Sequence, residues 1–338
     1  MYNKPMKSIP HAIQYQGSKR NLAPAILRYV SGSVDKLVEP FAGSAAISVA
    51  AAARGMAKTY SINDLNKPLV ELLRLIIEHP LETASFYERL WNEQHDDSIA
   101  HYYKVREDFN RTQDPRLFLY LLARCVKGSV RYNSEGLFNQ SPDKRRHGTR
   151  PSTMRTNIFG VSALLRGKAV FSSLDYRDVL AKAGKSDLVY MDPPYQGVCG
   201  ERDSRYFSGI SHDDFIDALK DLNSRGVAYI VSYDGRRGDK IFGELLPASL
   251  GLTRVELEAG RSSQSTLLGR DEVTFESLYL SRDLTKGLAS LSTDYTRPNA
   301  QQYVLLEPSS LCLNSPRIFS TSAIQSLQNV PRRLLITY

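Results

Sequence analysis

Residues 187–195 read Asp-Leu-Val-Tyr-Met-Asp-Pro-Pro-Tyr, and this segment indicates the centre of an α/β sheet. The run 188–191 is short and apolar, contains a β-branched and an aromatic residue, and is soon followed by proline, which predicts a buried central strand. Pro193 and Pro194 have no backbone N–H to donate, so they predict a stiff turn just after that strand. In open α/β sheets, ligands bind at this carboxyl end of the strands.

The turn carries three groups that suit one chemistry. The amino group of adenine is a poor nucleophile, because its lone pair is delocalised into the ring. The Asp192 carboxylate and the Pro193 carbonyl can accept its two N–H bonds and localise the lone pair, while the Tyr195 ring can stack on a base taken out of the helix. The alternative is a plain strand-capping turn, with Asp192 solvated and Tyr195 in the core.

Length and composition set the class of protein. A chain of 338 residues with 42% hydrophobic and 24% charged residues is typical of a globular protein with two domains, or with one large domain that carries an insertion. The net charge of +8 fits a polyanionic partner. No apolar run approaches the roughly 20 residues that span a membrane, and residues 1–10 lack the apolar region of a secretory signal.

The cysteines bear on location and on metal binding. Cys125, Cys199 and Cys312 are scattered along the chain without metal-ligand spacing. They therefore predict neither a disulfide framework nor a zinc site. We expect a cytoplasmic protein without a metal centre.

The first segments indicate a ligand-binding α/β unit. Residues 14–21 form a loop that leads into a helix over 22–30, and such a loop can receive an anion or can be a solvated turn. Residues 37–39 predict a strand that ends at Pro40, followed by a turn of small residues and an alanine-rich helix over 45–54. This unit lacks the Gly-x-Gly-x-x-Gly pattern of dinucleotide-binding proteins.

Two later strands each end in an acid. The strand 58–62 is followed by Asp64, which is placed to take ribose hydroxyls or to cap the helix Lys67–Glu78. A strand that starts near residue 168 is followed by Asp175, which is placed to contact the adenine edge of a cofactor. Further along, residues 196–211 form a loop that can close over a substrate or can be a plain surface loop. We then expect a helix over 213–224 and strands over 228–232, 253–258 and 273–281.

Between about residues 80 and 167 the alternation of strands and helices stops. Residues 80–91, 97–110 and 115–126 have helical apolar spacing, and residues 127–139 predict a hairpin with interleaved aromatic residues. Residues 142–150 form the densest cationic stretch. A charge run is usually a solvated face. This one adjoins Arg131, Tyr132 and Asn133, whose side chains can hydrogen-bond base edges or wedge into a base stack. We therefore favour a nucleic-acid surface.

Together, and in this order, the motifs resemble the bacterial DNA adenine-N6 methyltransferases of the alpha motif order, which include the adenine methylases of GATC sites and of many restriction systems. The resemblance covers roughly residues 11–282. The motifs that carry it are Tyr15-x-Gly-x-Lys19, Glu39-Pro-Phe-Ala-Gly43, Asp64, Arg131-Tyr-Asn-x-x-Gly-x-Phe-Asn139, Asp175 and Asp192-Pro-Pro-Tyr195.

The resemblance implies an α/β fold of the S-adenosylmethionine-dependent methyltransferase type. We expect a Rossmann-like, seven-stranded, mostly parallel sheet with one antiparallel strand, and an inserted, mainly helical target recognition domain that contains a β-hairpin. Residues 1–74 and 167–283 would form the catalytic domain, residues 75–166 the insert, and residues 284–338 a C-terminal extension without a recognisable motif.

The resemblance also implies roles for individual residues. The S-adenosyl-L-methionine site would consist of Tyr15, Lys19, Glu39, Phe41, Gly43, Asp64, Asp175 and Asp192, and the catalytic residues would be Asp192, Pro193 and Tyr195. Double-stranded DNA would contact Arg131, Tyr132, Asn133, Asn139, Lys144, Arg145 and Arg146. A cognate restriction endonuclease is a further candidate partner, and the enzyme can equally be a solitary methylase.

Two departures from the family pattern limit this comparison. Tyr15 stands where tryptophan is common, and the residues after Asn139 differ from those of the GATC methylases, so GATC is not carried over as the target. Cytosine-N4 methylation, typically with serine at the position of Asp192, stays an alternative. A non-catalytic DNA-binding protein on a methyltransferase scaffold is another. The sequence disfavours cytosine-C5 methylation, which needs a nucleophilic cysteine, usually in a Pro-Cys pair, because none of the three cysteines follows a proline.

Overall fold

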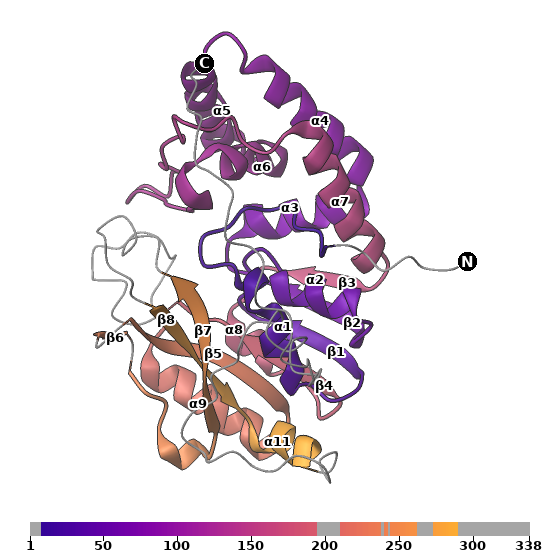
Figure 1. Cartoon of the computed structure of the whole chain (residues 1–338), viewed down its shortest axis with the longest axis vertical. Helices are drawn as coiled ribbons and strands as arrows, with labels where there is room; N and C mark the ends of the chain where they lie inside the picture. Colours follow the sequence, from indigo (N-terminus) through magenta and orange to yellow (C-terminus); the bar gives the residue numbers. More distant parts are fainter. Residues whose placement is uncertain (1–7, 195–209, 238–239, 243, 262–272, 290–338) are drawn as a thin grey trace, which may run out of the picture. The chain divides into compact units, whose positions relative to one another are not determined.

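The computed structural model of the protein describes residues 8–194, 210–237, 240–242, 244–261 and 273–289 (Figure 1). At its centre is one sheet with the strand order β3-β2-β1-β4-β5-β8-β7, and β6 pairs with β5 beside this path. The strands are β1 Val34–Glu39, β2 Ala57–Asn63, β3 Ala169–Ser172, β4 Asp187–Met191, β5 Ala228–Arg237, β6 Lys240–Phe242, β7 Thr253–Arg261 and β8 Val273–Leu280.

The direction of the strands confirms the expected fold class. The strands β1 to β5 pair in parallel along the sheet, whereas β8 is antiparallel to both β5 and β7. Among the described strands of this path, β8 is therefore the one reversed strand, as predicted. The short β6, antiparallel to β5, is an eighth strand that we did not predict.

The strand β4 occupies the middle of the sheet, as its apolar sequence predicts. Val189 pairs with Val38 on one side and with Tyr229 on the other. Every residue of β4 is buried, because helices cover both faces of the sheet. Asp187 is tolerated at its buried start because Lys36 Nζ lies 3.2 Å from its carboxylate and Gly184 N donates to it at 2.9 Å.

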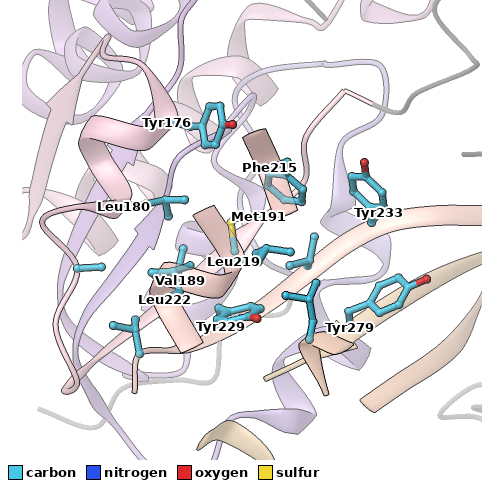
Figure 2. Close-up of a cluster of buried hydrophobic side chains, with 14 of the residues drawn as sticks. Tyr176, Leu180, Val189, Met191, Phe215, Leu219, Leu222, Tyr229, Tyr233 and Tyr279 are labelled. Atoms are coloured by element: carbon cyan, nitrogen blue, oxygen red, sulfur yellow. The ribbon is translucent and has the colours of Figure 1, made fainter. Parts of the chain in front are cut away.

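One face of the sheet is covered by α8 (Tyr176–Leu180) and α9 (His212–Arg225). Figure 2 shows their apolar side chains packed on those of β4 and β5, with Phe215 and Met191 near the centre of the cluster. Phe215 is fully buried and stacks on Tyr233 with ring centroids 5.3 Å apart. Burial of each such side chain contributes about 2–3 kcal/mol to folding.

The other face is covered by short helices. α2 (Ala46–Ala53) packs on β1 and β2, and α11 (Arg282–Ala289) packs on β5. The alanines of α2 let the helix lie close to the sheet. The expected single helix over residues 22–30 is wrong: the chain instead forms α1 (Ala23–Ile26) between two 3-10 turns, η1 (Lys19–Asn21) and η2 (Leu27–Tyr29). Its N-terminus has no side-chain cap, so tight i to i+3 bonds interrupt the α-helical pattern.

The segment between β2 and β3, which contains the expected insert over residues 75–166, is mainly helical, as expected. Its helices are α3 Lys67–Glu78, α4 Pro80–Glu93, α5 Ser98–Thr112, α6 Pro115–Arg124 and α7 Pro151–Leu165. The side chains of Asn66, Asp97 and Asp114 cap α3, α5 and α6. Helix α7, which we did not predict, packs on α3 and α4 and so joins the two ends of the insert (Figure 1).

The predicted hairpin is present as a compact loop rather than as two regular strands. Tyr132 and Phe138 form an isolated antiparallel bridge. Within the loop, the Asn133 side chain accepts hydrogen bonds from the backbone N–H groups of Glu135 and Leu137. Asn110 of α5 accepts from Phe138 N at 2.8 Å and donates to its carbonyl at 3.0 Å, which fixes the loop on the helices.

Two smaller 3-10 turns complete the fold, η3 (Val126–Gly128) after α6 and η4 (Ala248–Leu250) before β7. Among the described helices, none combines the length and the apolar character that crossing a membrane requires.

Candidate active site

A cavity of about 240 Å³ lies at the carboxyl ends of β1 and β4. The chain leaves β1 toward β2 and β3 on one side, and continues from β4 toward β5 on the other, so the strand order reverses between β1 and β4. Ligands of open α/β sheets bind at such a reversal. The cavity is lined by predicted cofactor residues (Tyr15, Lys19, Glu39, Phe41, Gly43, Asp64, Asp175, Asp192) and also by Tyr132, Tyr190 and Pro193.

The turn after β1 forms the floor of the cavity. The buried Glu39 carboxylate accepts a hydrogen bond from Ser48 N at 2.8 Å, which ties β1 to the start of α2. Burial, opposed by the Ser48 hydrogen bonds and reinforced by the charge of Asp192, raises the pKa of Glu39 to about 7. Gly43 has φ +50°, and a Cβ there would lie 3.2 Å from the Tyr15 ring. Glycine therefore lets the turn and the N-terminal loop approach closely.

Asp64, at the end of β2, is fixed by its own loop. One carboxylate oxygen accepts from Gly43 N and the other from Asn66 N, both at 2.9 Å. Burial raises the pKa of Asp64, and these two backbone hydrogen bonds oppose that shift. The side chain is thus held rigidly at the cavity wall, where it joins the turn after β1 to the start of α3.

Asn63, the residue before Asp64, organises three strand ends and was not predicted. Its side chain is fully buried. Nδ2 donates to the carbonyls of Pro40 at 2.9 Å and Leu174 at 3.0 Å, while Oδ1 accepts from Leu174 N at 2.9 Å and from Ser172 Oγ at 2.7 Å. One amide thereby aligns the loops after β1, β2 and β3. A polar residue at the end of an otherwise apolar strand is the sequence signal that could have identified it.

Asp175 lines the cavity, and its carboxylate already accepts hydrogen bonds from Arg177. Its carboxylate caps α8 through Arg177 N and accepts from Arg177 Nε, both at 2.9 Å. The hydrogen bond from the Arg177 side chain lowers the pKa of Asp175. Next to it, the Phe41 and Tyr176 rings lie 5.3 Å apart and give the cavity an apolar wall. A flat ring system that enters here meets aromatic faces and a carboxylate edge.

The Asp192 carboxylate lies beside a buried cation. Lys19 Nζ is 3.1 Å from Asp192 Oδ1 and 3.2 Å from Glu276 Oε2, and the Lys19 side chain is only 7% exposed. Pro193 is buried. Tyr195, the third predicted catalytic residue, lies outside the described residues, as does most of the expected closing loop. Glu276 was not predicted, because it belongs to a distant strand.

Tyr190 lies next to Asp192 and was predicted only as a strand residue. It is buried, lines the cavity, and its hydroxyl lies 3.2 Å from Ser232 Oγ. Burial raises the pKa of Tyr190 well above its usual value, so the phenol stays neutral. It adds a polar but uncharged group to the base of the cavity.

The residues predicted to contact DNA do not share one environment: one is buried at the cavity, and most of the others are exposed. Tyr132 is buried and lines the cavity, with its hydroxyl 3.1 Å from Asn66 Nδ2. Arg131 and Asn139 are exposed on the hairpin loop, and Asn133 is partly buried in its turn. The structure thus places Tyr132 at the cavity beside Asn66 and leaves Arg131 and Asn139 on the surface.

The cationic stretch over residues 142–150, here called the basic loop, presents its cations to solvent because a buried arginine holds its backbone. Arg124 is 1% exposed and donates to the carbonyl of Asp143 at 3.1 Å and to that of Arg146. Lys144, Arg145 and Arg146 are all exposed. Arg124 was not predicted, because an arginine in an apolar helix can equally be a surface residue.

Sequence comparison finds DNA adenine methylases among the proteins that are similar to this chain. A DNA adenine methylase of Serratia marcescens is 29% identical over 197 residues, which is 56% of this chain and 68% of that protein. The DNA adenine methylase of Escherichia coli K12 is 28% identical over 194 residues, or 56% of this chain and 66% of that protein. A DNA N-6-adenine-methyltransferase of Escherichia phage P1 is 25% identical over 245 residues, or 69% of this chain and 31% of that protein.

The chain thus spans about two thirds of the length of the bacterial relatives and a third of the phage protein. A sequence model of one family, the D12 class N6 adenine-specific DNA methyltransferases, matches residues 15–260. That match includes the cavity, the helical insert and the turn after β4. The chain therefore belongs to the D12 class of N6 adenine-specific DNA methyltransferases.

Proposed function

We propose that this chain transfers a methyl group from S-adenosyl-L-methionine to the N6 amino group of adenine at specific sites in double-stranded DNA. The observation that carries the proposal is the position of Asp192. Its carboxylate follows the central strand and borders the same cavity as Gly43 and Asp64. The acceptor for the adenine amino group and the groups suited to a cofactor thus share one cavity.

The chemistry of the cavity fits this cofactor. Asp64 offers a rigidly held carboxylate for a ribose diol, and the Phe41 and Tyr176 rings offer an apolar wall for an adenine ring beside Asp175. Tyr15 and Lys19 would lie by the methionine end. When bound, S-adenosylmethionine would supply an electrophilic methyl group on sulfur.

Asp192 and the Pro193 carbonyl would orient the reacting nitrogen. Two acceptors that bind the two amino N–H bonds localise the nitrogen lone pair and direct it toward the methyl group, so catalysis consists of positioning and electrostatics. No covalent enzyme intermediate is needed. After transfer, the surplus amino proton passes to water. Tyr195 would stack on the base.

The insert would bring the DNA to this cavity. A base inside a duplex must leave the stack to enter an enclosed site. Arg131, Asn133 and Asn139 would contact bases, and the exposed cations of the basic loop would bind phosphates. We assign catalysis to residues 1–74 and 167–283, recognition to residues 75–166, and leave residues 284–338 as an extension. A restriction endonuclease of the same specificity remains a candidate partner.

Nucleoside mass spectrometry tests the proposal. Purified protein is incubated with S-adenosylmethionine and unmethylated plasmid DNA, and the DNA is digested to nucleosides. We expect N6-methyladenine. N4-methylcytosine instead would establish the cytosine alternative, and absence of any methylated base, with no cofactor binding by calorimetry, would point to a non-catalytic DNA-binding protein.

A further inference from the structure

Glu276 is a carboxylate that the reaction described above does not use. It belongs to β8, the reversed strand of the sheet, far in sequence from the motifs of the site. Its side chain is 21% exposed, and Lys19 Nζ lies 3.2 Å from its Oε2. Lys19 therefore forms ion pairs with two carboxylates from different strands, Asp192 after β4 and Glu276 on β8.

Lys19 creates a conflict that Asp192 alone cannot resolve. A buried ammonium is costly unless it is paired, so Lys19 requires an acceptor. Asp192 must also offer an acceptor to the adenine amino group. If Asp192 were the sole carboxylate beside Lys19, the ion pair and the substrate would compete for the same oxygens, and the ammonium would withdraw the electron density that polarises the amino group.

We infer that Glu276 is a positioning residue that anchors Lys19 and so leaves Asp192 able to bind the adenine amino group. The lysine ammonium has three N–H donors. With the Glu276 carboxylate 3.2 Å away as a second ion-pair partner, Lys19 stays in place when Asp192 turns toward substrate. The inference rests on the proposed function, which supplies the role of Asp192.

The backbone around Glu276 is shaped for this contact. On β5, the pairing register shifts between Ser232 and Gly235, which is the mark of a β-bulge. Bulges re-aim side chains and occur next to active sites. Gly235 pairs directly with Glu276, and a Cβ at Gly235 would lie 2.6 Å from the Phe275 carbonyl oxygen. A residue without a side chain lets β8 approach at this point.

A double-mutant cycle tests the inference on methylation of plasmid DNA. The proteins are the wild type, Glu276→Gln, Lys19→Gln and the double variant. We expect Glu276→Gln to lower kcat about tenfold, with KM for DNA and cofactor within about twofold of wild type. In the Lys19→Gln background, Glu276→Gln should have no further effect, because Glu276 acts through Lys19.

The matched control is Glu256→Gln on the neighbouring strand β7. Glu256 is also partly buried and paired, with Arg236 at 3.1 Å and Arg254 at 3.3 Å, but it does not contact Lys19. The kcat of the Glu256→Gln variant should equal that of the wild type. If Glu276→Gln leaves kcat unchanged, or lowers it equally in both Lys19 backgrounds, Glu276 has no role through Lys19 and the inference fails.

A second measurement does not depend on activity. Competitive acetylation of the folded protein, read by peptide mass spectrometry, reports how firmly the Lys19 amine is held. We expect Lys19 labelling to rise about fivefold in Glu276→Gln and to stay at the wild-type level in Glu256→Gln. Equal labelling in all three proteins overturns the inference. A wild type that methylates no DNA would overturn the proposed function, while this labelling still decides whether Glu276 anchors Lys19.

Discussion

Replacement of Asn63 by leucine should damage both the stability of the protein and its cofactor site. Leucine has a similar size but cannot hydrogen-bond, so the carbonyls of Pro40 and Leu174 and the N–H of Leu174 lose their partner. Each buried backbone group left unpaired costs about 1–3 kcal/mol. Leu174 lies in a partly exposed loop where water can substitute, so we take the low end of the range. The apparent free energy of unfolding should fall by about 3 kcal/mol.

Urea unfolding, followed by circular dichroism at 25 °C, measures the stability loss, and calorimetry with S-adenosylmethionine measures the site. The matched control is Asn223→Leu, away from the cavity. It removes the hydrogen bond that Asn223 donates to Leu250 O at 3.1 Å and the one that it accepts from the Tyr229 hydroxyl at 3.0 Å. It should cost about 1–2 kcal/mol of stability without a change in cofactor affinity. An Asn63→Leu protein with wild-type stability, or with undiminished cofactor affinity, would refute the alignment role of Asn63.

Three further predictions concern the charges of the site and of the insert. Asp192→Asn keeps the shape but puts an amide where a carboxylate accepts the amino N–H, and kcat in a methyl-transfer assay should fall about 10²–10³-fold; a loss below threefold would contradict its role. Because the pKa of Glu39 is raised from 4.5 to about 7 in the folded state, the folded protein binds the extra proton between these values and stability should fall by about 2–3 kcal/mol as pH rises from 4.5 to 7. Glu39→Gln should flatten that dependence in unfolding curves at pH 5 and 7.5, and an unchanged slope would count against the shift. Simultaneous replacement of Lys144, Arg145 and Arg146 by alanine should weaken the salt dependence of DNA binding. The slope of log affinity against log salt concentration should fall by about one unit for each phosphate that these side chains neutralise, as measured by fluorescence anisotropy between low and moderate salt. An unchanged slope would remove the basic loop from the DNA surface.

The sequence motifs were sufficient for the sheet and for much of the cavity. The apolar run before Asp192 predicted the central strand, because a strand covered by helices on both faces needs apolar residues throughout. Parallel strands have their carboxyl ends at one edge, so the residues after each strand could be expected to converge. The cavity indeed brings together Tyr15, Gly43, Asp64 and Asp192.

The residues that were missed act through contacts between distant segments. Glu276 meets Lys19 only because β8 is inserted between β5 and β7. Arg124 is a core residue only because the basic loop turns its carbonyls toward α6. Tyr132 was predicted as a DNA contact but is buried beside Asn66, since an aromatic residue near a turn can face either side. Spacing along the chain contains none of these long-range pairings.

The most direct measurement is methylome sequencing of plasmid DNA from cells that express this protein or its Asp192→Ala variant. We predict N6-methyladenine in one recurring sequence motif with the wild type, and none with the variant. That result would establish the reaction, the base and the target together. Unmethylated DNA in both strains, with S-adenosylmethionine still bound by the purified wild-type protein, would contradict adenine methylation of DNA as the function of this chain.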